Sequence, residues 1–413
     1  MFNAVDIVVV GRFSGSQSLA AVGATTALIY LFTNLFIGIS LGANVLAARY
    51  YAAGKHEEMS ETVHTAMMFA LISGIIMIFV GLFFSRLALE IMGTPSDVID
   101  QATLYMRIYF LGMPFFMLYN YGAAILRAVG DTKRPLIFLI ISGVVNACLN
   151  MLLVIVFHLD VAGVAIATVT SQFISCVLVI GCLYRTKSSY QLRFSRLKIR
   201  KEYLKPICQV GIPAGIQSTV INFSNALLQS SVNSFGSTTM AGYTAANNIF
   251  GFLYVSVNAI TQACMSFTSQ NYGLRKLKRM DKILIDCLIL TVVVSLVLGG
   301  GVYLFGAEIL RLYTEEAEVI RCGIEIFAYT TVTYFLCGIM DLFPGALRGM
   351  DRSTVPMILS VIGTVGTRIV WVFWLFPAHR SLAFLFISYP ASWLITIAMQ
   401  VICFYLVRRK VHG

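Results

Sequence analysis

Long apolar segments alternate with short polar connections along the whole chain. An α-helix needs about 20 predominantly apolar residues to cross the hydrocarbon core of a bilayer. Eleven segments of suitable length can be placed, near residues 20–49, 62–84, 104–127, 136–157, 161–184, 207–234, 240–270, 283–305, 320–345, 355–376 and 381–407. A shorter apolar stretch covers residues 1–13. The pattern predicts an all-α integral membrane protein.

Composition excludes the other broad classes of protein. Hydrophobic residues make up 58% of the chain and charged residues 12%, whereas soluble proteins carry about 25% charged residues. So few charges cannot cover a water-exposed surface, which excludes cytosolic, disordered and disulfide-rich secreted proteins. The nine cysteines lie singly in apolar stretches, so we expect them to be packing residues.

The distribution of Lys and Arg predicts the orientation in the membrane. With successive connections on alternate sides, one side collects 23 Lys and Arg residues and the other collects six, while Arg368 falls within a segment. Lys and Arg concentrate on the cytoplasmic side of membrane proteins, so the richer side, which holds the C-terminus, is expected to be cytoplasmic. Orientation therefore accounts for the net charge of +11, and nucleic-acid binding is not needed to explain it.

Similar residues recur in the two halves of the chain at one constant spacing. Lys55, for example, matches Lys276. At the same offset, the pair Leu126 and Arg127 matches Leu347 and Arg348. Likewise, Pro135 matches Pro356. A register kept over five helices indicates duplication.

Duplication predicts the architecture. We expect twelve transmembrane helices in two parallel six-helix repeats, related by a pseudo-twofold axis along the membrane normal. The expected parts are an N-terminal lobe at 1–184, a basic cytoplasmic linker at 185–205 and a C-terminal lobe at 206–413.

The repeat also predicts that the first helix is incomplete. The seventh helix begins near Pro206, and its repeat mate would lie before Met1. A helix of about thirteen residues spans about 20 Å at 1.5 Å per residue, which is less than a core of about 30 Å. The sequence is thus expected to be truncated within helix one.

Asp6 is the first candidate for chemistry, because ionisable groups within a membrane are costly and usually functional. It lies nine residues before Gly15, at the external end of helix one, and so about 13 Å inside. An acid there can alternate between a protonated form and an ionised or cation-bound form as solvent access changes. Alternatively, it is hydrogen-bonded to neighbouring helices or simply hydrated.

Asp341 and Arg368 are the candidates in the second half. Asp341 lies about 10 Å from the cytoplasmic end of helix ten, and Arg368 lies in the middle of helix eleven. A pair between them would be a cheap way to hold a guanidinium in the membrane. Direct coupling or substrate contact is the other interpretation.

Neutral polar residues form a third group. Asn146 and Asn150 share one helical face, as do Thr168 and Gln172, and they could complete a cage around Asp6. Equally, such residues often only bridge helices. The candidates for a substrate cavity are Asn34, Gln172, Gln217, Asn225, Asn247 and Gln262. No phosphate-binding loop, zinc-protease, nucleophile-elbow or paired-carboxylate motif is found, so we expect neither an enzyme nor a cofactor.

Several short motifs resemble one family of transporters. They are Asn3-Ala4-Val5-Asp6 followed by Val10-Gly11-Arg12, Ala48-Arg49-Tyr50-Tyr51-Ala52-Ala53-Gly54, Leu126-Arg127 through Gly130-Asp131-Thr132 to Pro135, and Gly345-Ala346-Leu347-Arg348-Gly349. In this order they resemble the multidrug and toxic compound extrusion (MATE) family, over essentially the whole chain. The resemblance implies a two-lobe secondary transporter that exports organic cations or amphiphilic drugs in antiport with H⁺ or Na⁺ by alternating access.

The resemblance also implies roles for individual residues. Asp6 matches the coupling acid of helix one, Asn146 the Asn of helix five and Thr168 the Thr of helix six. Asn150 departs from the family, because bacterial members often carry an acid there. An amide cannot titrate, so the coupling site would depend on Asp6, with Na⁺ binding there as one option. Asp341 matches an acid that some members carry in helix ten.

Two further expectations follow from the resemblance. The protein is expected to lie in a bacterial plasma membrane as a monomer that handles drug-like small molecules and no nucleic acid. A lipid-linked oligosaccharide flippase of the same superfamily is the alternative, although such proteins tend to carry several cationic residues in a central cavity and only Arg368 qualifies here.

Overall fold

The computed structural model describes residues 6, 9–10, 13, 15–311, 314 and 316–412. All regular elements in this part of the chain are helices, as the apolar pattern predicts. The chain divides into two compact units, Met1–Gly215 and Ile216–Gly413, and each is described by itself.

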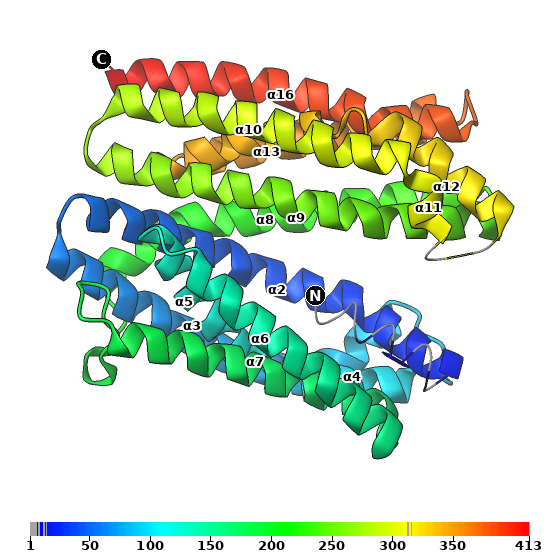
Figure 1. The fold of residues 1–413 in the computed structure, drawn as a ribbon, viewed down its shortest axis with the longest axis horizontal. Coiled ribbons are helices and arrows are strands. Elements are labelled where there is room, and N and C mark those ends of the chain that lie inside the picture. The colour runs from blue at the N-terminus through cyan, green and yellow to red at the C-terminus, as the bar shows by residue number, and fades with distance from the viewer. Residues whose placement is uncertain are drawn as a thin grey trace. The chain divides into compact units, whose positions relative to one another are not determined.

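The first unit contains the helices that run from blue to green in Figure 1. They are α2 (Gly15–Ala52), α3 (His56–Ile91), α4 (Ile99–Leu111), α5 (Met113–Ala128), α6 (Lys133–Met151) with its π-helical continuation η1 (Leu152–Val156), α7 (Asp160–Arg185) and the 3₁₀ turn η2 (Phe194–Arg196). The next helix, α8 (Lys201–Asn233), begins in the first unit and ends in the second.

The second unit continues with a similar series of helices. They are α9 (Ser237–Gly273), α10 (Leu277–Leu304), α11 (Gly306–Arg311), α12 (Ala317–Thr330), α13 (Tyr334–Gly349), α14 (Thr354–Ser360), the π-helix η3 (Val361–Gly366), α15 (Thr367–Val370), the π-helix η4 (Trp371–Leu375) and α16 (Leu382–His412).

Helix boundaries keep the offset that the sequence predicts. α5 begins at Met113 and α13 at Tyr334, while α6 begins at Lys133 and α14 at Thr354, so each pair is separated along the chain as the repeat requires. Each unit also has a bent pair of helices at the same place: 48° between α4 and α5, and 52° between α12 and α13. The described helices of the two units therefore follow the same order and spacing along the chain.

Each of the eleven expected spans corresponds to a helix or to a bent or continued pair. By length and composition, eight described helices could cross a membrane, or up to ten with each bent pair as one span. α8 is not among these ten, because polar residues such as Gln217, Asn222 and Asn225 follow one another along it. The expected incomplete helix at 1–13 lies largely outside the described residues.

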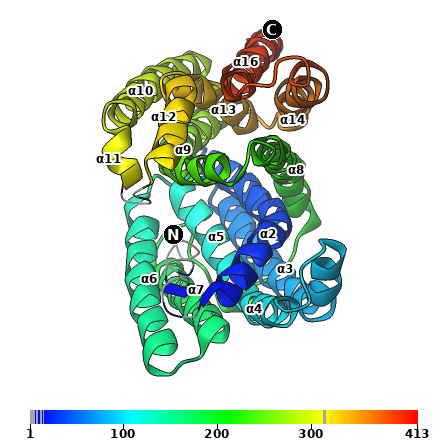
Figure 2. The ribbon, with the colours of Figure 1, turned by 90° about the vertical axis from the view of Figure 1, so that its right-hand side faces the viewer.

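α5 lies in the interior of the first unit, where it packs against α2, α3 and α7 and is seen nearly end-on in Figure 2. Glycines allow the closest approaches. A Cβ atom on Gly74 of α3 would overlap the backbone of Pro114 on α5. Large apolar side chains on outward faces, such as Phe83 at 73% and Leu304 at 74% exposure, suit contact with lipid rather than water.

The start of α8 packs on α2 through small residues. A Cβ atom on Gly38 would overlap the backbone of Gly215, and one on Gly42 would overlap the carbonyl oxygen of Ile207. This contact explains why the first compact unit includes the start of α8, up to Gly215, while the predicted lobe boundary before Pro206 stays a prediction. Small residues that let helix backbones meet closely are typical of membrane proteins.

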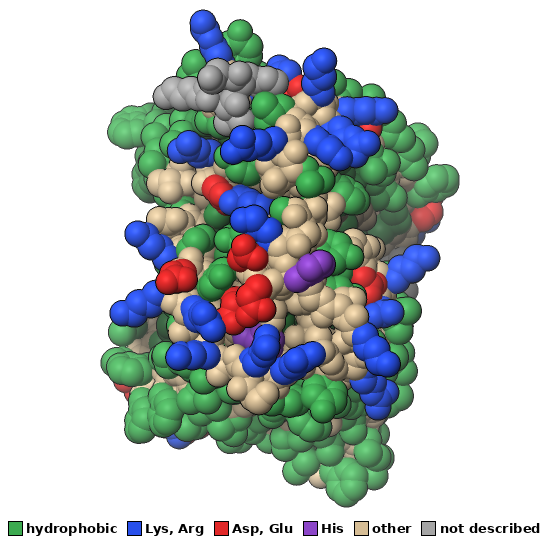
Figure 3. Space-filling view, turned by 90° about the vertical axis from the view of Figure 1, so that its left-hand side faces the viewer, with side chains coloured by type: hydrophobic (Ala, Val, Ile, Leu, Met, Phe, Trp, Pro, Cys, Tyr) green, Lys and Arg blue, Asp and Glu red, His purple; other side chains and the backbone are tan. Residues whose placement is uncertain are grey.

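Basic side chains gather at one end of the helices, which faces the viewer in Figure 3. In the first unit, the linker after α7 folds back on the start of α3 at this end. Arg200 forms an ion pair with Glu61 at 2.5 Å, and Nε2 of His64 accepts the backbone N–H of Arg193 at 3.0 Å. The linker is therefore held by specific contacts to α3.

Candidate functional site

The carboxylate of Asp6 lies at the centre of a buried polar group in the first unit. Its Oδ1 accepts a hydrogen bond from Nδ2 of Asn150 at 2.8 Å, and its Oδ2 accepts one from the hydroxyl of Thr168 at 2.8 Å. The hydroxyl of Tyr105 donates to the same Oδ2 at 3.4 Å. All four side chains are buried, so the carboxylate is satisfied by protein donors.

Asn146 links the other members of this group. Its Nδ2 donates to the hydroxyl of Thr168 at 3.2 Å, and its Oδ1 accepts from Nδ2 of Asn150 at 3.2 Å. Asn146 and Asn150 are one helical turn apart on α6 and so face the same way. The structure thus brings together Asp6, Asn146, Asn150 and Thr168, while their role in cation coupling stays a prediction.

Tyr105 is the member of the group that the sequence does not reveal. It lies on α4, where an aromatic residue in an apolar segment is typical of an ordinary core position. Only the fold shows that its hydroxyl reaches Asp6. Buried tyrosine hydroxyls usually find a hydrogen-bond partner, which is the one general signal that could have suggested it.

One oxygen of the group has no partner. Oδ1 of Asn150 is buried and makes no hydrogen bond within the described part of the chain, and leaving such an atom unpaired costs about 1–3 kcal/mol. If the Asn150 amide turned over, this oxygen could accept from a proton on Asp6 or bind a small cation beside it. No group of three or more His, Cys, Asp and Glu side chains suited to a metal ion occurs among the described residues. One carboxylate with neutral oxygens fits a monovalent cation better than a divalent one.

Arg368 occupies the corresponding region of the second unit and is only 3% exposed. Its NH1 donates to Oδ1 of Asn225 at 2.6 Å and to the hydroxyl of Ser224 at 3.5 Å. The guanidinium carbon lies 4.6 Å from the centre of the Tyr389 ring, which is close enough for a cation–π interaction. Neutral groups therefore hold this charge.

The expected ion pair between Asp341 and Arg368 is wrong. The groups that act electrostatically on Asp341 are instead the guanidinium of Arg348, two helical turns further along α13, and the hydroxyl of Tyr254. Residues seven apart lie on one face of a helix, so Arg348 reaches the acid from the same element. Arg368 instead reaches α8, which offers Asn225 and Ser224.

Arg348 connects Asp341 to further polar side chains of the second unit. Its NH2 donates to Oε1 of Gln217 at 2.6 Å, and Nε2 of Gln217 donates to Ser360 at 3.1 Å. The same hydroxyl accepts from Nε2 of Gln400 at 3.0 Å. The sequence counts Arg348 among the basic residues outside the membrane, whereas the structure places it within a hydrogen-bonded network.

The six residues expected to line a substrate cavity do not form one group. Gln217 and Asn225 hold the two arginines, and Gln262 donates to Asn258 on its own helix at 2.7 Å. Asn247 is exposed, Asn34 is half-buried and Gln172 is buried against Gly112 at the break between α4 and α5. A substrate role for these residues stays a prediction.

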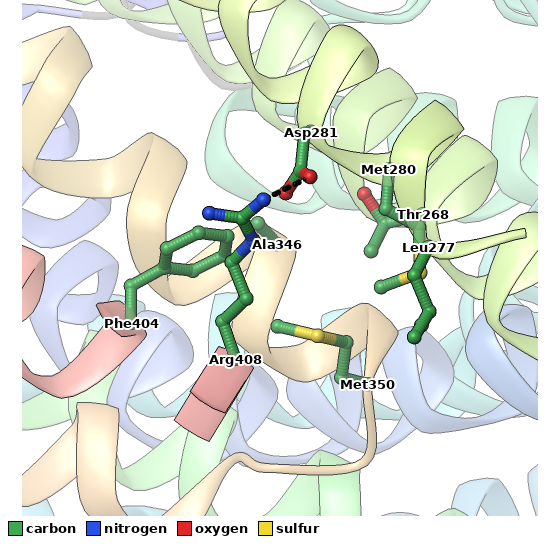
Figure 4. A pocket seen from close by; sticks show the side chains of 8 residues that line it. All are labelled: Thr268, Leu277, Met280, Asp281, Ala346, Met350, Phe404 and Arg408. Carbon is green, nitrogen blue, oxygen red and sulfur yellow. Dashed lines mark hydrogen bonds and ion pairs between the residues drawn. The ribbon is translucent and has the colours of Figure 1, made fainter. Parts of the chain in front are cut away.

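Figure 4 shows a small cavity at the basic end of the second unit. It lies between α10, α13 and α16, is lined mainly by apolar side chains such as Met280 and Phe404, and is bordered by the ion pair of Arg408 with Asp281. Its volume of about 10 Å³ is close to the least that holds one water molecule. It is too small for a drug.

Three comparisons relate the chain to known proteins. The MatE family model matches residues 1–152 and 213–374. A probable multidrug resistance protein of Bacillus subtilis, YoeA, is 28% identical over 96% of this chain and 87% of its own length. The multidrug export protein MepA of Staphylococcus aureus is 22% identical over 88% of this chain and 80% of its own length.

Solved structures show the same fold. A multidrug resistance MATE family transporter in an outward-facing conformation matches with a TM-score of 0.89 at 20% identity, over 100% of this chain and 91% of that chain. The Vibrio cholerae MATE transporter VcmN in its bent form matches with a TM-score of 0.89 at 18% identity, over 99% of this chain and 93% of that chain. These likenesses confirm the predicted fold, and with the match to the family model they show that the chain belongs to the MATE family of membrane transporters.

Proposed function

We propose that this protein exports drug-like organic cations or amphiphiles in exchange for H⁺ or Na⁺, by secondary active antiport with alternating access. The observation that carries the proposal is the Asp6 group. A fully buried carboxylate receives three hydrogen bonds there and stands beside an unpaired amide oxygen of Asn150. Such a group can take up one small cation and release it again.

The mechanism depends on what that cation changes. With Asp6 ionised, the hydroxyls of Thr168 and Tyr105 and the amide of Asn150 all donate to it. A proton on Asp6 turns one acceptor into a donor, and a Na⁺ ion draws oxygens instead of N–H groups, so either ion must rearrange these contacts. Ion and drug are coupled only if each changes the affinity for the other.

The substrate class and the cellular location are inferred from the relatives. The relatives in B. subtilis and S. aureus are named for multidrug resistance and multidrug export, which supports drug-like small molecules as substrates and a bacterial plasma membrane as location. The basic end (Figure 3) would face the cytoplasm together with the C-terminus. We expect a monomer without a cofactor or enzymatic activity.

The test is ethidium efflux from energised cells or vesicles, with and without Na⁺, for the native protein and the Asp6→Asn variant. Loss of efflux in Asp6→Asn protein that is present and folded would support coupling at Asp6, and the dependence on Na⁺ would identify the ion. Asp97→Asn is the matched control, because Asp97 is exposed between α3 and α4, and it should export normally.

Two outcomes would contradict the proposal. Unchanged efflux by the Asp6→Asn variant would remove Asp6 from the coupling site. No efflux by folded native protein in any buffer would instead favour the flippase of lipid-linked oligosaccharides.

A further inference from the structure

Arg368 carries a buried positive charge, and no acidic side chain among the described residues pairs with it. The titratable groups that act on it are Tyr389, Cys337 and Tyr243, and none of these is a carboxylate. Asp341, the acid expected to pair with it, interacts with Arg348 instead. Burying an unpaired charge is costly, so its retention within a membrane span suggests a use beyond packing.

The hydrogen-bonding capacity of this guanidinium is not exhausted. NH1 is taken by Asn225 and Ser224, but Nε is buried and has no partner within the described residues. Asn225 is half-buried, and its amide oxygen, 2.6 Å from NH1, occupies a place where a ligand oxygen could bind. Arginine presents its N–H groups as a planar fork that matches a carboxylate.

The repeat places Arg368 at the counterpart of the Asp6 group. At the repeat offset, Tyr389 is the mate of Thr168, and Thr367 is the mate of Asn146. The π-helix η3 precedes Arg368, whereas the matching stretch of α6 is regular α-helix. A π-turn widens the hydrogen-bonded ring by one residue, so beyond η3 residue 368 takes the face of residue 367. Arg368 over Tyr389 therefore corresponds to Asn146 bonded to Thr168.

The two units thus carry buried charges of opposite sign in corresponding regions. The first unit has a buried acid that receives hydrogen bonds, and the second has a buried base with a free donor. Each unit also has a π-helix shortly after these residues, η1 after Asn150 and η4 after Arg368, although the two are not in the same register of the repeat. Such π segments occur frequently at functional sites.

We propose that Arg368, with Asn225, Ser224 and Tyr389, forms a subsite for the carboxylate of a transported amphiphile. This inference deepens the proposed function and rests on it, because the bound amphiphile is a transported substrate only if the protein is an exporter. The carboxylate would accept from Nε and from NH2, which lie on the same edge of the guanidinium, while NH1 keeps the amide oxygen of Asn225 and the Tyr389 ring stays under the guanidinium.

The experiment compares two dyes that differ only in this group, rhodamine B with its free carboxylate and its ethyl ester. Full-length protein in nanodiscs is titrated with each, and binding is followed by fluorescence polarisation. One charge-assisted hydrogen bond contributes about 1.5–3 kcal/mol, so the native protein should bind the acid roughly ten- to a hundredfold more tightly than the ester.

The Arg368→Gln variant should lose this preference and keep its affinity for the ester. Arg380→Gln is the matched control, because Arg380 is exposed between η4 and α16, and it should keep the preference. Asn225→Asp supplies a carboxylate from the protein itself and pairs the buried charge. This variant should therefore fold even if Arg368→Gln does not, and it should also lose the preference for the acid.

Retention of the preference by both Arg368→Gln and Asn225→Asp, or an equal loss of affinity for acid and ester in both, would overturn the proposal. Binding needs no ion gradient, so Asp6→Asn protein should keep the preference. If the preference is found while the native protein shows no efflux in any condition, the proposed function fails and the carboxylate subsite stands.

Discussion

At the scale of residues, the buried polar side chains of the candidate site in the first unit are hydrogen-bonded around the carboxylate of Asp6. The hydroxyl of Thr168 both donates to Asp6 at 2.8 Å and accepts from Asn146 at 3.2 Å. Both contacts are buried, where hydrogen bonds are strong and unpaired groups are costly. The affinity of the site for its cation should therefore depend on this hydroxyl.

We expect Thr168→Val to weaken the apparent affinity for the coupling ion about tenfold, since loss of a hydrogen bond to a charged group costs about 1.5–3 kcal/mol. Efflux measured against Na⁺ concentration and against pH checks this. Thr170→Val is the control, because the hydroxyl of Thr170 bonds only the carbonyl of Ile166 on its own helix. Equal ion dependence in the two variants would show that the Thr168 hydroxyl plays no part.

The sequence predicts the members of this site only in part. Asn146, Asn150 and Thr168 stand out because amides and hydroxyls are unusual in apolar segments and their spacing places them on single helix faces. Tyr105 does not stand out, since an aromatic ring suits any core. The partner of Arg368 could not be predicted either, because its choice of Asn225 over Asp341 depends on which helix faces α15.

At the scale of elements, the linker between α7 and α8 is held by ionic and hydrogen-bond contacts to the start of α3. The carboxylate of Glu61 is only 10% exposed and lies 2.5 Å from Nε of Arg200. The nearby Thr65 hydroxyl donates to the carbonyl of Lys198 at 3.4 Å. The sequence predicts a basic linker but not this docking, because a charge run alone does not show which surface it meets.

We expect Glu61→Gln to loosen the linker and to increase the rate of trypsin cleavage after residues 193–200 severalfold, because the ion pair to Arg200 becomes a weaker neutral contact. Glu57→Gln is the matched control. Its carboxylate is 72% exposed and lies 3.9 Å from Arg196, and exposed pairs of this kind contribute about 0–1 kcal/mol. Identical cleavage rates for native and Glu61→Gln protein would contradict a docked linker.

Close packing of α3 on α5 gives a second prediction for elements. A Cβ atom on Gly74 overlaps the backbone of Pro114, whereas one on Gly143 of α6 meets nothing within 4 Å. Overpacking against a backbone costs about 1–3 kcal/mol, so Gly74→Ala should lower the thermal unfolding temperature in detergent. Gly143→Ala should leave it equal or slightly higher, because Ala favours helix over Gly. Equal unfolding temperatures would show that α3 can move away from α5 at no cost.

At the scale of the whole molecule, the sequence predicts the repeat well. The offset read from single matches such as Lys55 with Lys276 reappears in the first residues of α5 and α13 and of α6 and α14. Duplication fixes the order and length of helices, because apolar spans have to match the same bilayer. It does not fix the charges inside them, since Asp6 and Arg368 have no charged mates at that offset.

The orientation in the membrane follows from the distribution of charge over the whole molecule. The connections that the sequence assigns to one side hold 23 of the Lys and Arg residues and the others hold six, so the basic side should be retained in the cytoplasm during insertion.

A fluorescent protein that matures only in the cytoplasm, fused after Gly413, should therefore fluoresce. Alkaline phosphatase, which is active only outside the cytoplasm, should be active when inserted after Gly93, in the connection between α3 and α4. The reciprocal fusions are the controls and should be inactive. Fluorescence at Gly93 with phosphatase activity at Gly413 would reverse the topology, and Asp6 would then lie towards the cytoplasmic side, where it could not receive an ion from outside in the way that export requires.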